Sequence, residues 1–305
     1  MSASPSSAVR PELTKVARRT HRSRTPVGTI LRYLLLTIAA LAFLYPLWWA
    51  MSSSIKPPSQ IITDALGFNP ASATLINYRS MLASVPIGTG FRNTAIVIVI
   101  KGAVTLLFCP LAGYAFAKYD FRGKNILFGA VLLTLMLPVL VLIIPLLLEM
   151  STLHWINTFQ ALILPGSIDA FSIFWMRQAI HAVPNELLDA ARVDGASEFG
   201  IYWRVIVPVI RPGLAALGVL TFMNIYNDFV WPVVAANTTD KETLQVVLST
   251  LSQGISGGKA TGLDFTQVWG QLLAASTLAM LPVLLVFVLL QRHFINGILA
   301  GSVKG

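Results

Sequence analysis

Charged residues are scarce in this sequence. Asp, Glu, Lys and Arg make up 11% of its 305 residues, whereas a soluble globular domain carries about 25%. Cysteine is nearly absent: Cys109 is the only one, so an intrachain disulfide is impossible and a disulfide scaffold is excluded. The apolar share is 55% and the mean hydropathy is +0.71. These values argue against a soluble enzyme, a disordered chain and a collagen-like rod, and they predict a polytopic membrane protein.

Six apolar stretches with few or no charged residues are long enough to cross a bilayer. The first follows a basic leader, exceeds the apolar core of a signal peptide and lacks a small-x-small cleavage site, so we expect it to be retained. The predicted spans are 33–55, 95–117, 126–148, 159–180, 213–234 and 268–290. The chain is therefore divided into a basic cytoplasmic N-terminal arm, 1–28, and a transmembrane domain, 29–305.

The net charge of +9 comes from basic residues between the apolar runs. They do not gather on one amphipathic face, so they do not indicate nucleic-acid binding. With both termini in the cytoplasm, sixteen of the 22 Lys and Arg residues lie inside, five lie outside and Lys101 falls within a span. The positive-inside rule favours this orientation.

The long cytoplasmic connection between the fourth and fifth spans predicts two short helices. Asn185 is expected to cap the first, with Glu186 and Asp189 in its first turn, where carboxylates complement the helix dipole. Gly195 is expected to end it in a left-handed conformation, and Ser197 to cap the second helix. The small residues Ala190 and Ala191 suit close docking onto another protein, but an ordinary amphipathic interfacial helix fits the pattern too.

A spaced motif runs through this connection. It reads Asp189-Ala190-Ala191, three residues, Gly195, nine residues, then Val205-Ile206-Val207-Pro208. It resembles the E-A-A-x-x-x-G-x(9)-I-x-L-P signature of ABC importer permeases, with conservative departures at Asp189, Val205 and Val207. Further segments resemble the maltose-type second permease of the carbohydrate-uptake branch; they are 54–57, 77–80, 114–117, 121–124, 226–229 and 297–305. The resemblance covers about residues 28 to 305.

This resemblance implies an all-α polytopic protein with six transmembrane helices and the ABC type I importer permease fold, in a bacterial inner membrane. Its partners would be a second homologous permease, two cytoplasmic ABC ATPase subunits, an extracytoplasmic solute-binding protein and membrane lipid. No G-x-x-x-x-G-K-[ST] motif occurs in the sequence, so ATP and Mg²⁺ would be bound by the ATPase subunits. The chain itself would be non-catalytic. Its cargo would be a sugar or derivative of the oligosaccharide, polyol or glycerol-phosphate type.

The resemblance also assigns the first helix of the connection as a coupling helix that sits in a cleft of the ATPase. Closure of the ATPase pair would move it as a lever and exchange an inward-open cavity for an outward-open one. The residues expected to couple are Glu186, Leu187, Leu188, Asp189, Ala190, Ala191, Asp194, Gly195, Ala196 and Pro208. Glu186 and Asp189 are candidates for salt bridges to the ATPase.

Polar residues inside the spans are candidates for the substrate pathway, because a charge at mid-bilayer costs about 2.5–3.5 kcal/mol. They are Asn224, Asn227, Asp228, Asp169 and Lys101. The first four would hydrogen-bond sugar hydroxyls or bridge helices. Lys101 departs from the resembled family, whose second span is apolar there. It would reach the outer interface, pair with one of the two carboxylates, or meet an anionic group of the substrate.

Two other functions stay open from the residues alone. A stand-alone secondary transporter or channel would also have six spans with scattered intramembrane charges. A membrane-embedded enzyme is the third reading, although no metal site is expected, because the four histidines are dispersed. They are His21, His154, His181 and His293.

Overall fold

The computed structural model describes residues 26–64, 66–67, 69–256 and 263–302. Within these residues the chain forms helices and no strands, which confirms the predicted all-α class. The chain divides into two compact units, 1–48 and 49–305, which are described separately. Most of the predicted basic arm, up to residue 25, lies outside the described residues.

The first unit contains most of helix α1, which spans Pro26–Ser54. Pro26 suits the first turn because its missing N–H would have no partner there. Large apolar side chains are exposed along the helix, with Phe43 82% exposed. A helix that exposes apolar residues on this scale matches the composition of a transmembrane span.

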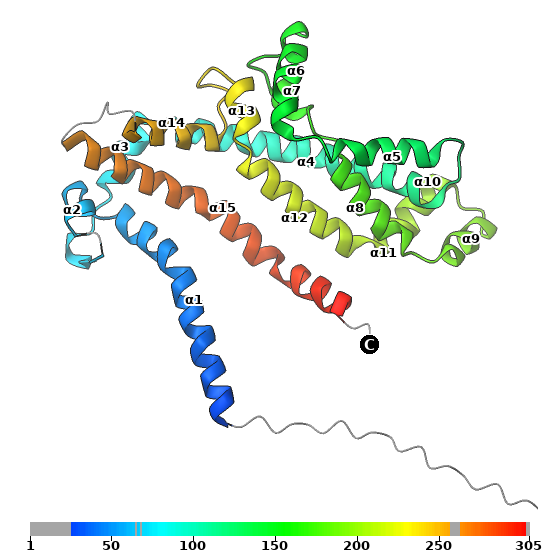
Figure 1. Ribbon diagram of the computed structural model, residues 1–305, viewed down its shortest axis with the longest axis horizontal. Coiled ribbons are helices and arrows are strands. Elements are labelled where there is room, and N and C mark those ends of the chain that lie inside the picture. Colours follow the sequence, from blue (N-terminus) through cyan, green and yellow to red (C-terminus); the bar gives the residue numbers. More distant parts are fainter. Residues whose placement is uncertain (1–25, 65, 68, 257–262, 303–305) are drawn as a thin grey trace, which may run out of the picture. The chain divides into compact units, whose positions relative to one another are not determined.

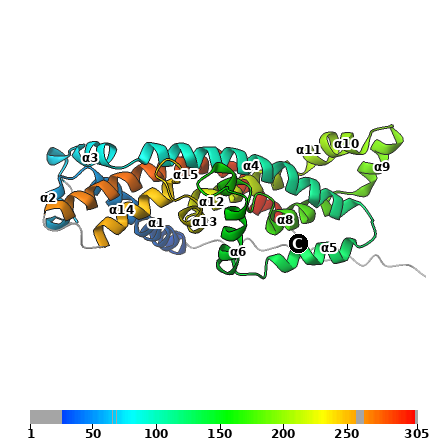
Figure 2. The ribbon, with the colours of Figure 1, turned by 90° about the horizontal axis from the view of Figure 1, so that it is seen from above.

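The second unit contains the remaining elements (Figure 1). They are α2 (Pro58–Thr63), η1 (Pro70–Ser72), α3 (Ile76–Ser84), α4 (Ile87–Lys118), α5 (Lys124–Thr134), α6 (Val139–Thr152), α7 (Phe159–Ile163), α8 (Ala170–His181), α9 (Asn185–Val193), α10 (Glu198–Ile201), η2 (Tyr202–Ile206, a π-helical turn), α11 (Val207–Val209), α12 (Arg211–Asn227), α13 (Val230–Ala235), α14 (Leu244–Ser256) and α15 (Leu263–Ser302). Figures 1 and 2 place α2 and α3 at the end of this unit opposite to α9 and α10.

Helix α4 is the axis of the second unit, with α8 and α12 packed along it. A Cβ atom at Gly113 would lie 2.8 Å from the backbone nitrogen of Arg177, so only glycine allows α4 and α8 to pack this closely. Beside this contact lies an apolar cluster that includes Tyr114, Met176, Leu188, Ile206 and Leu217. Because these residues come from α4, α8, α9, η2 and α12, the cluster fixes α9 onto the long helices.

Three helices are long and apolar enough to cross a membrane: α1, α4 and α15. Two further pairs qualify only if each bent pair forms one span, namely α5 with α6, bent by 99°, and α10–α11 with α12, bent by 80°. The predicted span 126–148 is therefore a broken one, interrupted before Pro138. The described residues thus contain three to five candidate spans, and the count of six stays a prediction.

The predicted spans 159–180 and 213–234 are also not continuous helices. The first is divided into α7 and α8 by a non-helical segment that contains Pro165 and Gly166, and Gly166 has a left-handed φ of +68°. The second is divided at Asp228, which has an extended backbone between α12 and α13. Both breaks place polar backbone and side chains within apolar sequence, which membrane proteins tolerate where the break is buried in protein or lines a cavity.

Candidate functional site

Helix α9 begins at Asn185, and its N-cap is Pro184, which makes no side-chain capping bond. The prediction that Asn185 caps the helix is therefore wrong: Asn185 is the first residue of the helix itself and lies one position after the cap. Its Oδ1 instead accepts a hydrogen bond of 2.7 Å from Lys118 Nζ. The same ammonium donates to the carbonyl of Val183 over 2.5 Å. Lys118 thus joins the end of α4 to the start of α9.

The glycine turn after α9 has the predicted form. Gly195 has a φ of +78°, its N–H donates to the Arg192 carbonyl, and the N–H of Ala196 donates to the Ala191 carbonyl, both over 3.0 Å. These two bonds form a Schellman motif, which satisfies the last carbonyls of a helix. Ser197 then caps α10 by accepting a hydrogen bond from the N–H of Gly200, so both predictions for this turn are confirmed.

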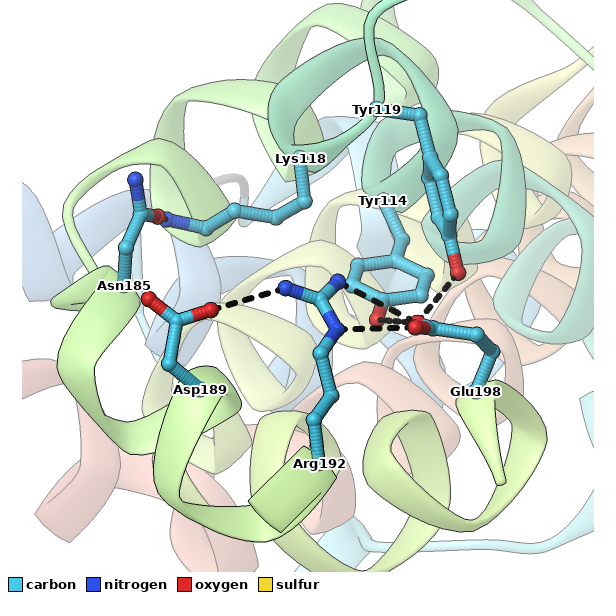
Figure 3. Close-up of polar contacts among 7 residues, drawn as sticks. All are labelled: Tyr114, Lys118, Tyr119, Asn185, Asp189, Arg192 and Glu198. Atoms are coloured by element: carbon cyan, nitrogen blue, oxygen red, sulfur yellow. Dashed lines mark hydrogen bonds and ion pairs between the residues drawn. The ribbon is translucent and has the colours of Figure 1, made fainter. Parts of the chain in front are cut away.

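A charged network crosses the turn (Figure 3). Arg192 donates to Asp189 over 2.9 Å and to Glu198 over 2.8 Å. Glu198 also accepts hydrogen bonds from the hydroxyls of Tyr119, at 2.6 Å, and Tyr114, at 3.3 Å. Asp189, predicted to pair with the ATPase, therefore has an ion pair within its own chain. Through this network α9 and α10 are attached to the end of α4.

The protonation states in this network follow from its contacts. Hydrogen bonds from Arg192 are the main cause that lowers the pKa of Glu198 to about 2. The hydrogen bond to Glu198 likewise raises the pKa of the Arg192 guanidinium. Burial, assisted by the hydrogen bond to Glu198, raises the pKa of the Tyr119 hydroxyl. At neutral pH the carboxylate is therefore ionised and the phenol donates, as the observed geometry requires.

The predicted coupling residues divide into two groups. Leu188 is 2% exposed, and Ala191 and Ala196 pack on the apolar cluster around it, so these three anchor the helix. The outward group is exposed and comprises Glu186, Leu187, Asp189, Ala190, Asp194 and Gly195. Pro208 is half-buried in the first turn of α11, after the π-helical turn. Helix α9 thus has one anchored face and one face available to a partner.

Sequence reasoning missed Arg192, Glu198, Tyr119 and Lys118. The spacing of three residues between Asp189 and Arg192 on one helix could have indicated their ion pair. No comparable signal connects Glu198 with Tyr119, which are 79 positions apart in the sequence.

The structure brings four of the five pathway candidates together. Lys101 from α4, Asp169 before α8, and Asn224 and Asp228 at the end of α12 line one cavity of about 240 Å³. Asn227 is not among its lining residues, because its exposed side chain donates to the carbonyl of Met223 in its own helix. Among the residues that the structure describes, no group of three or more His, Cys, Asp or Glu side chains is placed to hold a metal ion.

A comparison with known protein families shows to which family the chain belongs. Residues 110–299, more than half of the chain, match the family described as binding-protein-dependent transport system inner membrane component. The chain belongs to this family. It is therefore a multi-pass inner-membrane permease subunit, and the predicted family resemblance is confirmed.

Named members of the permease family align over nearly the whole chain. The arabinooligosaccharides transport system permease protein AraQ of Halalkalibacterium halodurans is 34% identical, over 89% of this chain and 96% of that protein. The lactose transport system permease protein LacG of Rhizobium radiobacter is 36% identical, over 93% and 99%. The crystal structure of a bacterial ABC transporter that imports the acidic polysaccharide alginate contains a chain with a TM-score of 0.75. That chain is 25% identical, with 88% of this chain and 96% of that chain covered. The permease thus has the fold of an ABC importer subunit.

Proposed function

We propose that this permease subunit moves a sugar or sugar derivative into the cytoplasm, driven by ATP hydrolysis on a separate subunit through the segment 184–208. The observation that carries the proposal is helix α9. One of its faces is anchored in the permease by Leu188, while its other face exposes Leu187 and Ala190. A helix held in this way transmits a push from a docked partner to the helices behind it.

The route of this push has two branches. The first passes from Leu188 and Ala191 into the apolar cluster shared with α8 and α12. The second passes through Arg192 and Glu198 to Tyr119 at the end of α4. Because α8, α12 and α4 also line the polar cavity, both branches end at the elements that would have to rearrange when a substrate passes.

The assembly follows from the family. A second homologous permease, two ATPase subunits that bind ATP and Mg²⁺, and an extracytoplasmic binding protein would complete the importer. This chain would bind and guide cargo without catalysing a reaction. In the proposed orientation both termini and α9 face the cytoplasm. Two relatives are named for uncharged cargo, arabinooligosaccharides and lactose, whereas the alginate importer takes an acidic polysaccharide. The fold alone therefore does not set the charge of the substrate.

Co-purification from native membranes tests the proposal. We expect wild type and Ala190→Ser to retain a second permease and an ATPase, and Ala190→Trp to retain the permease and lose the ATPase. The reason is that Ala190 is exposed on the outward face, so a large side chain there blocks docking and leaves the buried anchor intact. An ATPase that stays bound to Ala190→Trp, with normal ATP-driven uptake, would argue against docking through α9.

The stand-alone transporter is the alternative function, and the same experiment separates it from the proposed one. It would be favoured if the wild-type permease purified without an ATPase and still transported sugar into vesicles in the absence of ATP. The proposed function would then be wrong, whatever the behaviour of the Ala190 variants.

A further inference from the structure

The cavity between α4, α8 and α12 is formed by three elements that approach one another at the breaks in the predicted spans. Lys101 and Thr105 come from the middle of α4, Gly166 and Asp169 from the segment between α7 and α8, and Asp228 from the end of α12. A break that exposes polar groups inside a membrane protein is tolerated where it lines a cavity. The position of these breaks therefore points to a place built for polar contents.

The walls of the cavity are fixed by hydrogen bonds. Asp169 caps α8 by accepting from the N–H of Ser172 over 2.9 Å and from its hydroxyl over 2.5 Å. The hydroxyl of Thr105 donates to the carbonyl of Ser167 over 2.6 Å, which holds the α7–α8 segment on α4. These contacts fix the position of the Asp169 carboxylate before any substrate arrives, which lowers the cost of binding.

Lys101 is the exception to this pattern. Its half-buried side chain makes no hydrogen bond or ion pair with any residue that the structure describes, although Asp228 and Asp169 interact with it electrostatically. The predicted direct pair with either carboxylate is thus not formed. A Cβ atom at Gly166 would lie 3.7 Å from Lys101 Nζ, in van der Waals contact, so the break at Gly166 lies directly beside the ammonium. The ammonium has three hydrogen-bond donors and shares the cavity lining with the two carboxylates.

The composition of the lining selects a type of ligand. Two carboxylates accept hydrogen bonds, Lys101 donates them and Asn224 does both, which matches hydroxyl groups that act as donor and acceptor at once. Phe171 and Leu217 add apolar surface to the same cavity, and sites for small ligands combine apolar surface with a few polar groups. The volume of about 240 Å³ is below that of pockets for drug-sized ligands, which hold about 300–1,000 Å³. It therefore suits one ring of a sugar chain.

We propose that this cavity binds one uncharged sugar unit of the cargo and discriminates against anionic sugars. One ammonium and two carboxylates give the lining a formal charge of −1, so an added carboxylate or phosphate meets net repulsion. The charge of Lys101 offsets part of the charge of the two carboxylates, and its ammonium donates to hydroxyls. This inference rests on the proposed function and specifies the class of substrate, which the fold leaves open.

A cysteine-protection experiment on the assembled importer in lipid nanodiscs tests the proposal. Leu220→Cys places a thiol in the cavity lining and leaves its polar side chains unchanged. The rate at which this thiol reacts with a methanethiosulfonate reagent is measured in the presence of each of four sugars. They form two pairs, galactose with galacturonate and glucose with glucuronate, and the members of each pair differ only in the group at C6. The native Cys109 is buried, so wild type gives the background. Asp240→Cys, at an exposed carboxylate outside the cavity, gives the rate for a thiol that no sugar protects.

We expect galactose or glucose to slow the labelling of Leu220→Cys about threefold at twice its dissociation constant, and the two uronates to leave it unchanged. Adding Asp228→Asn neutralises the lining. It should weaken protection by the neutral sugars about tenfold in apparent affinity, because a hydrogen bond to a charged group is lost, and it should make the uronates protective. If Asp228→Asn fails to assemble, Asn224→Ala should weaken neutral protection and keep the uronates excluded.

Three results would overturn the proposal: equal protection by both members of a pair, stronger protection by the uronates, or no protection by any sugar. An importer that retains its ATPase and lacks protection would refute the sugar site and leave the proposed function intact. Protection in a permease that binds no ATPase would refute ATP-driven import and leave the site intact.

Discussion

In the α9–α10 turn the charged side chains of Arg192, Asp189 and Glu198 are paired with one another, whereas in the cavity Lys101 has no such direct partner among the described residues. The first group is largely exposed, where an ion pair costs little to form and contributes little. The second lies in a membrane helix, where an isolated charge is costly. The turn thus uses its charges to keep a shape, and the cavity keeps its charges available for a ligand.

Removing the cavity cation should have the largest effect. Lys101→Met leaves Asp169 and Asp228 without a compensating charge, and we expect the assembled importer to lose about 3 kcal/mol of stability. The measurement is the fraction of complex that survives heating, determined by size-exclusion chromatography. The double variant Lys101→Met with Asp228→Asn removes one charge of each sign, so it should recover part of the loss. A double variant no more stable than Lys101→Met would show that the two charges do not compensate each other.

The glycine turn should come next. Gly195 has a φ of +78°, and a Cβ atom added there would meet no other atom within 4 Å, so Gly195→Ala adds only backbone strain, of about 1 kcal/mol. We expect a several-fold loss of ATP hydrolysis stimulated by the binding protein, because the end of α9 shifts. Gly123→Ala is the matched control, since Gly123 has a φ of +87° and equally open surroundings. Equal losses in both variants would mean that strain alone, at any position, is responsible.

Features of this structure that depend on residues close together in the sequence were predictable, whereas those that depend on residues far apart in the sequence were not. The turn at Gly195 and Ser197 was predictable because a left-handed glycine and a serine cap act within a few residues. The cap at Asn185 was not, because a long-range bond from Lys118 takes its side chain. Apolar composition located the long helices, but it could not place the breaks at Gly166 and Asp228. The first of these lies in a segment that is held on α4 by the long-range bond from Thr105 to Ser167.

The cavity shows the same limit. Lys101, Asp169, Asn224 and Asp228 were predicted as candidates because polar groups are rare in apolar runs, and the fold assembles all four. Asn227 had the same signal and lies elsewhere. Asn227 and Asp228 lie three and four positions after Asn224, and both spacings allow one side of a helix, so the sequence could not separate them. In the structure the Asn227 side chain donates to the carbonyl of Met223 and takes no part in the cavity.

The charged network should give a smaller effect than the turn. Arg192→Gln removes the contacts to both Asp189 and Glu198, but all three side chains are exposed enough for water to replace much of the interaction. We expect a small loss of coupled ATP hydrolysis, which disappears at high salt, where wild type is screened as well. The control is Lys241→Gln, which removes an ion pair outside the turn between the half-buried Lys241 and the exposed Asp240, together with the contact of Lys241 to the Phe159 ring. A loss independent of salt would indicate a role for Arg192 beyond charge.

The pH dependence of the network should be the smallest effect of all. The pKa of Glu198 is lowered to about 2 in the folded chain. The ionised carboxylate therefore contributes its full stability at pH values above the pKa of an ordinary carboxyl group. This contribution is lost as the pH falls toward the pKa of Glu198 in the folded chain. The loss therefore falls between about pH 5 and pH 2. The ratio of coupled ATP hydrolysis in wild type to that in Glu198→Gln should then stay flat from about pH 5.5 to pH 8. A slope in this ratio would require a titrating group near Glu198 other than its partners Arg192, Tyr119 and Tyr114. Hydrogen bonding to Glu198 raises the pKa of the Arg192 guanidinium and burial raises the pKa of the Tyr119 hydroxyl. A phenol ordinarily loses its proton only near a pKa of about 10, above this range.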